Sequence, residues 1–434
     1  MDLSRPGPLL ATAPAPQRRA GRSIQPAAMP QLLSAGGLVY VPGSSGAPLP
    51  FMAELTRDPE LTRDARILTT YVPGINPLDL CGVHPSARVT GLFMQPGLTQ
   101  AQREQRFRAL PMSYSGFVRH LQDHVEIDLA VVQVSEPDEH GQCSLGPAVE
   151  FMPVALRKSR RRLALVNRST PRLSGSVSVP FDSFDYVCEV DSPLPVYETP
   201  VDAGTEAIAR HIAPLVDDGS VLQAGLGKVP TALMRLLRDR RRLRLHSGML
   251  SDGLLELAQA GALDMDFAHT TCVLVGSTGF YDAVRHFGPL RVLGCDVTHH
   301  PLTLSRMERF VAVNSALEVD LFGQCNLERS NGAAVSGPGG APDFAHAGRH
   351  SRGGCSIVAL HACHKGGSRI VPCLGERALA TLSRLDVDHV VTEFGVARLQ
   401  GASVHERAEA LIEIAAPEYR AELREAWRAI AARL

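Results

Sequence analysis

Short apolar runs that end in glycine turns recur along this chain. The clearest lies at residues 219–253, GSVLQAGLGKVPTALMRLLRDRRRLRLHSGMLSDG, and reads as strand, glycine loop, helix, strand and second loop. Residues 220–224 are a mostly apolar strand candidate. Gly225 and Gly227 permit a tight turn with close backbone approach, and Pro230 suits the first turn of the helix TALMRLLRDR.

The strand that follows this helix, residues 243–246, delivers His246, Ser247 and Gly248 to the same edge. A glycine turn that leads into a helix presents unpaired N–H groups to an anion or a carbonyl oxygen. In an open α/β sheet, ligands bind at the carboxyl ends of the strands. We therefore expect the functional site at this edge.

The remaining pattern alternates strands with helices. GGLVYVPGSSGAPLP, from Gly36, echoes the strand and glycine turn of GSVLQAGLGKVP, which suggests two halves with one plan. Strand candidates are residues 66–71, 127–134, 162–166, 270–275 and 387–392, and FVAVNSALEVDLFGQ suggests paired strands. This order predicts mainly parallel sheets.

Two irregular stretches and the C-terminus complete the pattern. SGPGGAPDF, residues 336–344, is expected to be a loop whose glycines allow another group to approach its backbone closely. Residues 365–367 are expected to form a glycine turn between two strands. The C-terminus is helical, with a capping box of Ser403 and Glu406 and a helix break near Pro417.

The length of 434 residues favours two domains. Residues 1–27, rich in Ala, Pro and Arg, are expected to be a disordered tail, because the prolines argue against an amphipathic mitochondrial presequence. Residues 28–190 and 200–434 are the two expected α/β domains, and DSPLPVYETP at residues 191–200 is the candidate linker.

Composition narrows the function classes. The chain is 44% hydrophobic and 21% charged with a net charge of -1, so it has no basic field for nucleic acid. No apolar run approaches the roughly 18 residues of a membrane span, and no signal peptide is recognisable, so we expect no membrane partner and a cytoplasmic protein. Its nine cysteines lack any CxxC pair and are expected to be reduced.

Two other ligand classes are disfavoured. Cys355, His361, Cys363 and His364 lack paired metal-ligand spacing, so we expect no metal. A nicotinamide-binding turn would need a third glycine where Pro230 stands, and a ribose-binding acid after the next strand.

GLGKVP, HSGMLSDG, STGFYDAV, NSALEVD, SGPGGAPDF, GSRIVP and TEFGVARLQGASVHERAEALIEIA together resemble the acetyl-CoA hydrolase/transferase family, particularly the 4-hydroxybutyrate CoA-transferase type. YVPGINPLDL and EHGQCSLG extend the resemblance into the N-terminal half. It implies two similar open, mainly parallel α/β domains with the active site in the cleft between them. It also implies an acyl-CoA and a carboxylate as substrates, coenzyme A as the acyl carrier, acetate metabolism and a homodimer.

The resemblance also implies where CoA binds. The GxGxxP turn corresponds to Gly225, Leu226, Gly227, Lys228 and Val229. The glycine-rich loop corresponds to Gly339 and Gly340, the turn after a lysine to Lys365, and a wall of the cleft to Glu393, Gly395 and Ala397. Backbone amides at glycine turns suit phosphates and a thioester oxygen, and a lysine beside such a turn suits a phosphate.

The family nucleophile is a glutamate two residues after the histidine, and here that position is Gly248. Glycine cannot attack an acyl-CoA to form a mixed anhydride. Ser247 is a poor substitute, because it points to the other face of the strand from His246 and Gly248. Either Glu393 or Asp252 supplies the carboxylate, or water acts with His246 or Asp252 as base, which would make a thioester hydrolase. The last alternative is binding without turnover.

Overall fold

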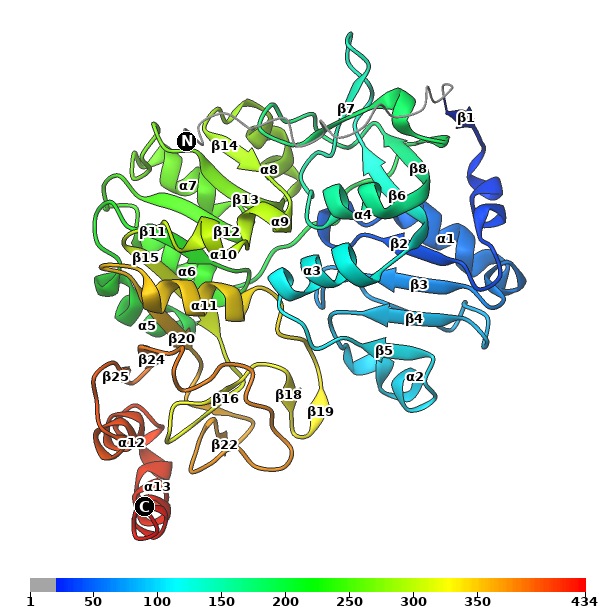
Figure 1. Cartoon of the computed structure of the whole chain (residues 1–434). Helices are drawn as coiled ribbons and strands as arrows, with labels where there is room; N and C mark the ends of the chain where they lie inside the picture. Colours follow the sequence, from blue (N-terminus) through cyan, green and yellow to red (C-terminus); the bar gives the residue numbers. More distant parts are fainter. Residues whose placement is uncertain (1–20) are drawn as a thin grey trace.

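The computed structural model describes residues 21–434, which form two lobes that each contain an eight-stranded sheet (Figure 1). All strand pairs of the first sheet are parallel. In the second sheet, the antiparallel pair is the one between the last two strands. The fold class expected from the sequence, two open and mainly parallel α/β sheets, is confirmed.

The strands of the first sheet are, in spatial order, β1 (Arg22–Ser23), β10 (Tyr186–Val190), β8 (Ser159–Asn167), β6 (Ile127–Val134), β2 (Leu38–Val41), β3 (Arg66–Thr69), β4 (Arg88–Gly91) and β5 (Phe107–Ala109). Those of the second are β14 (Leu290–Val292), β13 (His269–Leu274), β12 (Arg244–Leu250), β11 (Val221–Ala224), β15 (Phe310–Ser315), β20 (Cys355–Ala359), β24 (His389–Thr392) and β25 (Gly395–Arg398). Smaller sheets pair β16 (Glu318–Asp320) with β17 (Cys325–Asn326) and β23 (Ile370–Val371), β18 (Arg329–Ser330) with β19 (Ala333–Ala334), β21 (Cys363–His364) with β22 (Gly367–Ser368), and β7 (Gln142–Ser144) with β9 (Ser178–Pro180).

The α-helices of the N-terminal lobe are α1 (Leu49–Arg57), α2 (Thr99–Arg103), α3 (Tyr114–His124) and α4 (Met152–Lys158). Those of the C-terminal lobe are α5 (Ala203–Ile212), α6 (Lys228–Leu236), α7 (Gly253–Gln259), α8 (Thr278–Ala283), α9 (Cys295–Thr298), α10 (Pro301–Leu304), α11 (Ala341–His350), α12 (Val404–Glu413) and α13 (Arg420–Ala431). Helix α12 begins with the predicted capping box of Ser403 and Glu406. Helix α9 packs on β12 and β13 and also contacts α3, so it lies where the two lobes meet.

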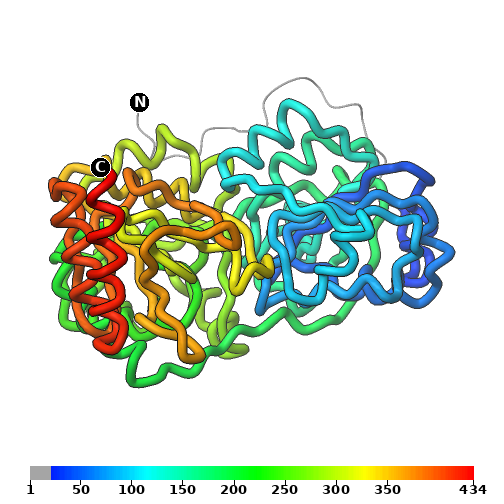
Figure 2. Tube along the Cα trace, turned by 90° about the horizontal axis from the view of Figure 1, so that it is seen from below, coloured from blue at the N-terminus to red at the C-terminus, as the bar shows by residue number. Residues whose placement is uncertain are grey.

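Residues 191–200 contain no helix or strand and carry the chain from the first lobe to the second. Figure 2 shows this crossing in green along the lower side of the view. The lobes nevertheless share one continuous hydrophobic core that includes Phe117 and Phe151 from the first lobe and Val273 and Phe280 from the second.

Backbone hydrogen bonds reinforce this shared core. The N–H of Val149 donates to the carbonyl of Cys272 at 3.0 Å, and the N–H of Cys295 donates to the carbonyl of Glu150 at 2.7 Å. The segment just before α4 is therefore hydrogen-bonded to β13 and to the start of α9, and these bonds fix the position of one lobe against the other.

Three details differ from the sequence expectation. Residues 1–20 of the expected tail lie outside the described residues, but Arg22 and Ser23 already form β1, which pairs with β10. Strand β12 is longer than expected and runs through Gly248 to Leu250. The alternation in FVAVNSALEVDLFGQ belongs to β15 and β16, which lie in different sheets and do not pair with each other.

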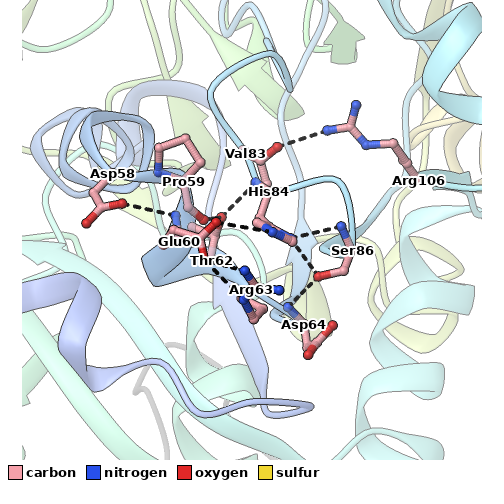
Figure 3. Close-up of polar contacts among 10 residues, drawn as sticks. All are labelled: Asp58, Pro59, Glu60, Thr62, Arg63, Asp64, Val83, His84, Ser86 and Arg106. Atoms are coloured by element: carbon pink, nitrogen blue, oxygen red, sulfur yellow. Dashed lines mark hydrogen bonds and ion pairs between the residues drawn. The ribbon is translucent and has the colours of Figure 1, made fainter.

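A polar network secures the entry to β3 and lies away from the carboxyl ends of the strands. The Thr62 hydroxyl accepts from the N–H of His84 at 2.9 Å, and the Ser86 hydroxyl accepts from the N–H of Asp64 at 2.9 Å (Figure 3). Arg106 donates to the carbonyl of Val83 at 3.0 Å. These bonds tie the loop before β4 to its neighbours on both sides.

Candidate active site

A cavity of about 320 Å³ lies between the lobes at the carboxyl edge of the second sheet. The N-terminal lobe contributes apolar and aromatic side chains, namely Val72, Pro73, Ile75, Phe93 and Tyr114. The C-terminal lobe contributes glycines and uncharged polar groups, namely Gln223, Gly225, Gly248, His299, Asn314, Gly339 and Gly340, together with the apolar Leu226, Met249, Pro338, Ala341 and Phe344. One wall is therefore suited to an apolar group and the opposite wall to a polar group.

The glycine wall arises because three neighbouring strands end together. Ala224 pairs with Val313 in the register of β11 and β15, so the next residues, Gly225 and Asn314, are also neighbours. Gly248 lies on β12, the strand on the other side of β11. No atom lies within 4 Å of a Cβ built on Gly225, so this glycine leaves an open notch in the sheet face, with Gly248 and Asn314 on the neighbouring strands.

Gly248 has an ordinary backbone conformation and close neighbours at the position of a side chain. A Cβ atom at this position would lie 3.3 Å from Nε2 of His299 and 3.4 Å from Cε2 of Phe344. Its φ angle is outside the left-handed region that favours glycine. A larger residue is therefore compatible with the backbone at position 248, provided that His299 gives way slightly.

Ser247 points away from this space, as strand alternation predicts. Its hydroxyl donates to the carbonyl of Ala224 at 2.8 Å, and the residue is fully buried. Ser247 is therefore held by a structural hydrogen bond on the face opposite to Gly248.

His299, from the end of α9, is the titratable side chain nearest to the Gly248 position. Its ring lies between Tyr114 and Phe344, with centroid distances of 4.9 and 4.5 Å. Nδ1 is 2.8 Å from the hydroxyl of Thr298, whereas Nε2 is buried and has no hydrogen-bond partner. Burial lowers the pKa of His299 to about 3, so the ring is neutral at neutral pH.

Three buried polar atoms on this wall lack partners, namely Nε2 of His299, Oε1 of Gln223 and Nδ2 of Asn314. Most buried polar groups in proteins are hydrogen-bonded, and an unpaired one is costly. Three such atoms around one cavity indicate that the cavity receives a polar guest.

The sequence did not single out His299, Gln223 or Asn314. Gln223 and Asn314 lie inside apolar strand patterns, and His299 follows a four-residue helix whose position depends on tertiary packing. The available signal was their place at the ends of strands, where polar residues break an apolar run.

The three acid-base candidates proposed from the sequence lie outside this cavity. His246 is buried and its Nε2 is 2.8 Å from the carbonyl of Thr298, while burial lowers its pKa to about 4. Asp252 accepts two hydrogen bonds from Ser277, at 3.0 and 2.5 Å, beside a separate cavity of about 560 Å³.

Glu393 accepts the N–H of Ala362 at 2.9 Å, and its carboxylate is 4.0 Å from Nδ1 of His361. These contacts give Glu393 a structural partner at the end of β24. None of the three side chains, Glu393, Asp252 and His246, lines the cavity at Gly248.

The residues expected to bind CoA divide into two groups. Gly225, Leu226, Gly339 and Gly340 line the cavity. The others lie outside its lining. Gly227, with φ of 128°, caps α6, Lys228 forms an ion pair with Asp202 at 2.8 Å, and Val229 and Ala397 are buried. Lys365 lies on the turn between β21 and β22, and Gly395 begins β25 after the turn that follows β24.

The glycine-rich loop at residues 336–340 joins the lobes. The N–H of Met94 donates to the carbonyl of Ser336, and that of Tyr114 to the carbonyl of Gly339 at 3.2 Å. A Cβ at Gly337 would lie 2.2 Å from the carbonyl oxygen of Leu92. The backbone that approaches this loop most closely is thus that of the N-terminal lobe.

Among residues 21–434, one group could hold a metal ion, consisting of Cys272, Cys295 and His299, whose ligand atoms lie within 4.8 Å of one another. Metal binding requires thiolates, whereas burial raises the pKa of the Cys295 thiol well above its usual value. The thiol of Cys272 contacts the carbonyl of Gly248 at 3.0 Å. In this state both cysteines pack as thiols beneath the notch.

None of the helices in the described part of the chain has the length and apolar character needed to cross a membrane. Residues 106–198 match the acetyl-CoA hydrolase/transferase N-terminal domain, and residues 276–427 match the C-terminal domain.

Two curated relatives extend this match. The 4-hydroxybutyrate coenzyme A transferase of Clostridium kluyveri is 36% identical over 68% of this chain and 71% of the relative. The succinyl-CoA:cyclohexane-1-carboxylate CoA transferase of Geobacter metallireducens is 33% identical over 79% of this chain and 81% of the relative.

A solved structure of 4-hydroxybutyrate CoA-transferase from Porphyromonas gingivalis agrees with a TM-score of 0.77. It is 28% identical, and the alignment covers 94% of this chain and 97% of that one. Sequence and fold lead to the same conclusion: the chain belongs to the acetyl-CoA hydrolase/transferase family.

Proposed function

We propose that this enzyme transfers CoA between a small acyl-CoA and a carboxylic acid, and that the reaction takes place in the cavity beside Gly248. Its relatives include CoA-transferases and acetyl-CoA hydrolases, so enzymes of this family act on CoA thioesters. The observation that supports the location is the polar wall with three unpartnered atoms, which faces an apolar wall from the other lobe.

The cavity has features that suit a thioester. Gly225 has open space where a side chain would be, since no atom lies within 4 Å of a Cβ built there. Gly339 and Gly340 expose backbone at the start of α11. The CoA arm can therefore lie close to the main chain, with its acyl group directed at Val72, Ile75 and Phe93.

The reacting carboxylate of this site does not come from the cavity lining. Gly248 supplies none, and the cavity is lined by no aspartate or glutamate among the described residues. Hydrolysis is the second candidate, because a water molecule held by His299, Asn314 and Gln223 would occupy the same space. Transfer is favoured by the relatives, which are CoA-transferases at 36% and 33% identity.

The roles of Lys228, Val229, Lys365, Gly395 and Ala397 in CoA binding belong to this proposal, as do the homodimer, the cytoplasmic location and a role in acetate metabolism. They rest on the family resemblance. Of the two lysines, Lys228 is the nearer in sequence to the cavity wall, because it starts the helix that follows Gly225 and Leu226.

The test is a transfer assay with butyryl-CoA as donor and acetate as acceptor, in which acetyl-CoA is measured by mass spectrometry. Wild type should form acetyl-CoA and release butyrate. Gly340→Val should lose both binding and turnover, because a Cβ at this position would lie 2.5 Å from Nε2 of His299. Free CoA without acetyl-CoA would favour hydrolysis, and no thermal shift with any acyl-CoA would refute the assignment.

A further inference from the structure

We propose that the carboxylate of the acceptor acid occupies the space beside Gly248 and attacks the thioester directly, so that transfer passes through a complex of enzyme, acyl-CoA and acid. This inference rests on the proposed CoA transfer. It identifies the molecule that supplies the nucleophile. Because Gly248 has no side chain, we assign that role to the acid substrate.

The space has the correct position for such a group. The Cα–Cβ direction of Gly248 points from β12 into the cavity, toward His299 and Phe344. Because a Cβ in that direction would already lie 3.3 Å from Nε2 of His299, a carboxylate fits on the side of Gly248 that faces Gly225, at the carboxyl edge of the sheet. It would also be next to Gly225, where the thioester arm has open room.

The polar atoms around the space match a carboxylate guest. Asn314 offers an unpartnered Nδ2, which is a donor. The single hydroxyl proton of Thr298 can go to Nδ1 of His299 at 2.8 Å or to the carbonyl of Gly294 at 3.3 Å; when it goes to the nearer Nδ1, the ring proton lies on Nε2 and faces the same space. Rotating the amide of Gln223 by half a turn exchanges its unpartnered oxygen for a third donor.

Charge favours a bound anion that remains reactive. No aspartate, glutamate, lysine or arginine is among the residues that line the cavity, so a guest carboxylate meets neither repulsion nor an ion pair. His299 is neutral because burial lowers its pKa to about 3. Neutral donors hold a carboxylate more weakly than a cation does, so the acid should bind weakly and keep its nucleophilic oxygen available.

The step is balanced without any further reactant. A carboxylate oxygen of the acid forms a bond to the thioester carbon, the C–S bond breaks, and the CoA thiolate leaves. The product at this stage is the mixed anhydride of the two acids. The thiolate then attacks the carbonyl carbon of the acceptor acid, which yields the new acyl-CoA and releases the original acyl group as its carboxylate.

A pair of glycine variants tests the location. Gly248→Ala places a methyl group in the proposed slot, 3.3 Å from Nε2 of His299, and should raise the KM for the acid about tenfold. Gly225→Ala makes the same change one strand away, where the new methyl meets no atom within 4 Å. It should affect the KM for acyl-CoA more than that for the acid. The reverse pattern would place the acid elsewhere and overturn the proposal.

Oxygen tracing tests the chemistry. A single turnover with excess enzyme, butyryl-CoA and oxygen-18-labelled acetate in unlabelled water is quenched, and butyrate is analysed by mass spectrometry. Direct attack predicts butyrate that carries one acetate-derived oxygen after the first turnover. Initial rates that vary both substrates should give intersecting lines.

The other outcomes separate this inference from the proposed function. New acetyl-CoA with unlabelled butyrate, together with parallel initial-rate lines, would show a carboxylate of the enzyme as the nucleophile. Transfer would then stand and direct attack would fall. Unlabelled butyrate together with free CoA, and without new acetyl-CoA, would make the protein a hydrolase and remove both.

Discussion

The two lobes contain equivalent glycine turns that are used in opposite ways. In the N-terminal lobe, β2 ends at Val41 and leads into a turn with Gly43 and Ser44. In the C-terminal lobe, β11 ends at Ala224 and leads into Gly225. A carboxylate of the protein fills the first turn, whereas the second opens into the cavity.

The first turn is closed by Glu150, which is buried. Its carboxylate accepts from the hydroxyl of Ser44 at 2.5 Å and from that of Thr70 at 3.1 Å. The N–H of Ser44 donates to the side chain of Asn76, and that of Gly43 to the hydroxyl of Thr70. Glu150, Ser44, Thr70 and Asn76 thus bond to one another and to the backbone of this turn.

The second turn differs, because it has open room beside Gly225 and three unpartnered polar atoms nearby. Burial of a carboxylate is therefore not a sufficient sign of catalysis in this fold. The site is better identified by buried polar atoms that still need a partner.

Breaking the closed turn should have the largest effect on stability. Glu150→Ala leaves the hydroxyls of Ser44 and Thr70 without their acceptor and creates a cavity. We expect a loss of about 4 kcal/mol in the free energy of unfolding. Urea unfolding at pH 6 measures it, with Glu256→Ala as the control, since Glu256 is partly exposed and lies 3.9 Å from Arg235. A loss equal to that of the control would contradict the structural role.

The same carboxyl should make stability depend on pH. Burial raises the pKa of Glu150 from 4.5 to about 7, so the folded state holds its proton more tightly than the unfolded chain does. This stabilisation is complete below pH 4.5 and is lost as pH rises through 7, by up to about 3 kcal/mol.

The neutral substitution Glu150→Gln should flatten that profile between pH 4.5 and 7, as measured by urea unfolding at each pH. The neighbouring phenol of Tyr40 and thiol of Cys295 stay neutral throughout this range, because burial raises the pKa of each. An unchanged profile in the variant would assign the pH dependence to other groups.

Filling the open turn should change the mechanism at small cost to stability. Gly248→Glu is compatible with the backbone, and a shift of His299 by a few tenths of an ångström accommodates its Cβ, so we expect a loss of about 1 kcal/mol. The variant should gain a borohydride-sensitive glutamyl-CoA adduct and parallel initial-rate lines, whereas wild type should show neither. If the variant binds CoA normally and forms no adduct, Gly248 does not face the thioester.

The smallest effect is expected at Lys365, on the exposed turn between β21 and β22. If this lysine contacts a CoA phosphate, Lys365→Ala should raise the KM for acyl-CoA about twofold at low salt and less at high salt, because an exposed ion contact is screened. Titration at two ionic strengths checks this. Equal values for variant and wild type at both would leave Lys365 without a role in binding.

The sequence predicted the parts of the fold that depend on local pattern. Strand β6 has the predicted bounds, the capping box of α12 is present, and Ser247 faces away from Gly248 because strand side chains alternate. The glycines at 225, 339 and 340 were also identified before the structure, and they line the cavity.

The rest depends on contacts between elements distant in sequence. His299 reaches Gly248 only because α9 packs over β12, and Asn314 only because β15 lies beside β11. Glu150 is buried because turns from β2 and β3 fold over it. Glu393 and Asp252 are suitable acids by type, but their hydrogen bonds with Ala362 and Ser277 were not visible in the sequence.

The most direct test of the central claim is a crystal structure with a ketone analogue of butyryl-CoA, in which a methylene group separates the sulfur from the carbonyl carbon so that the analogue cannot be cleaved. We predict that its carbonyl carbon lies beside Gly225 and faces Gly248, so that the space between the carbonyl and His299 stays free for the acid, with the butyryl chain against Val72 and Phe93. An acyl group found elsewhere, for example in the cavity of about 660 Å³ lined by Arg103, Arg329 and Arg377, would contradict the account.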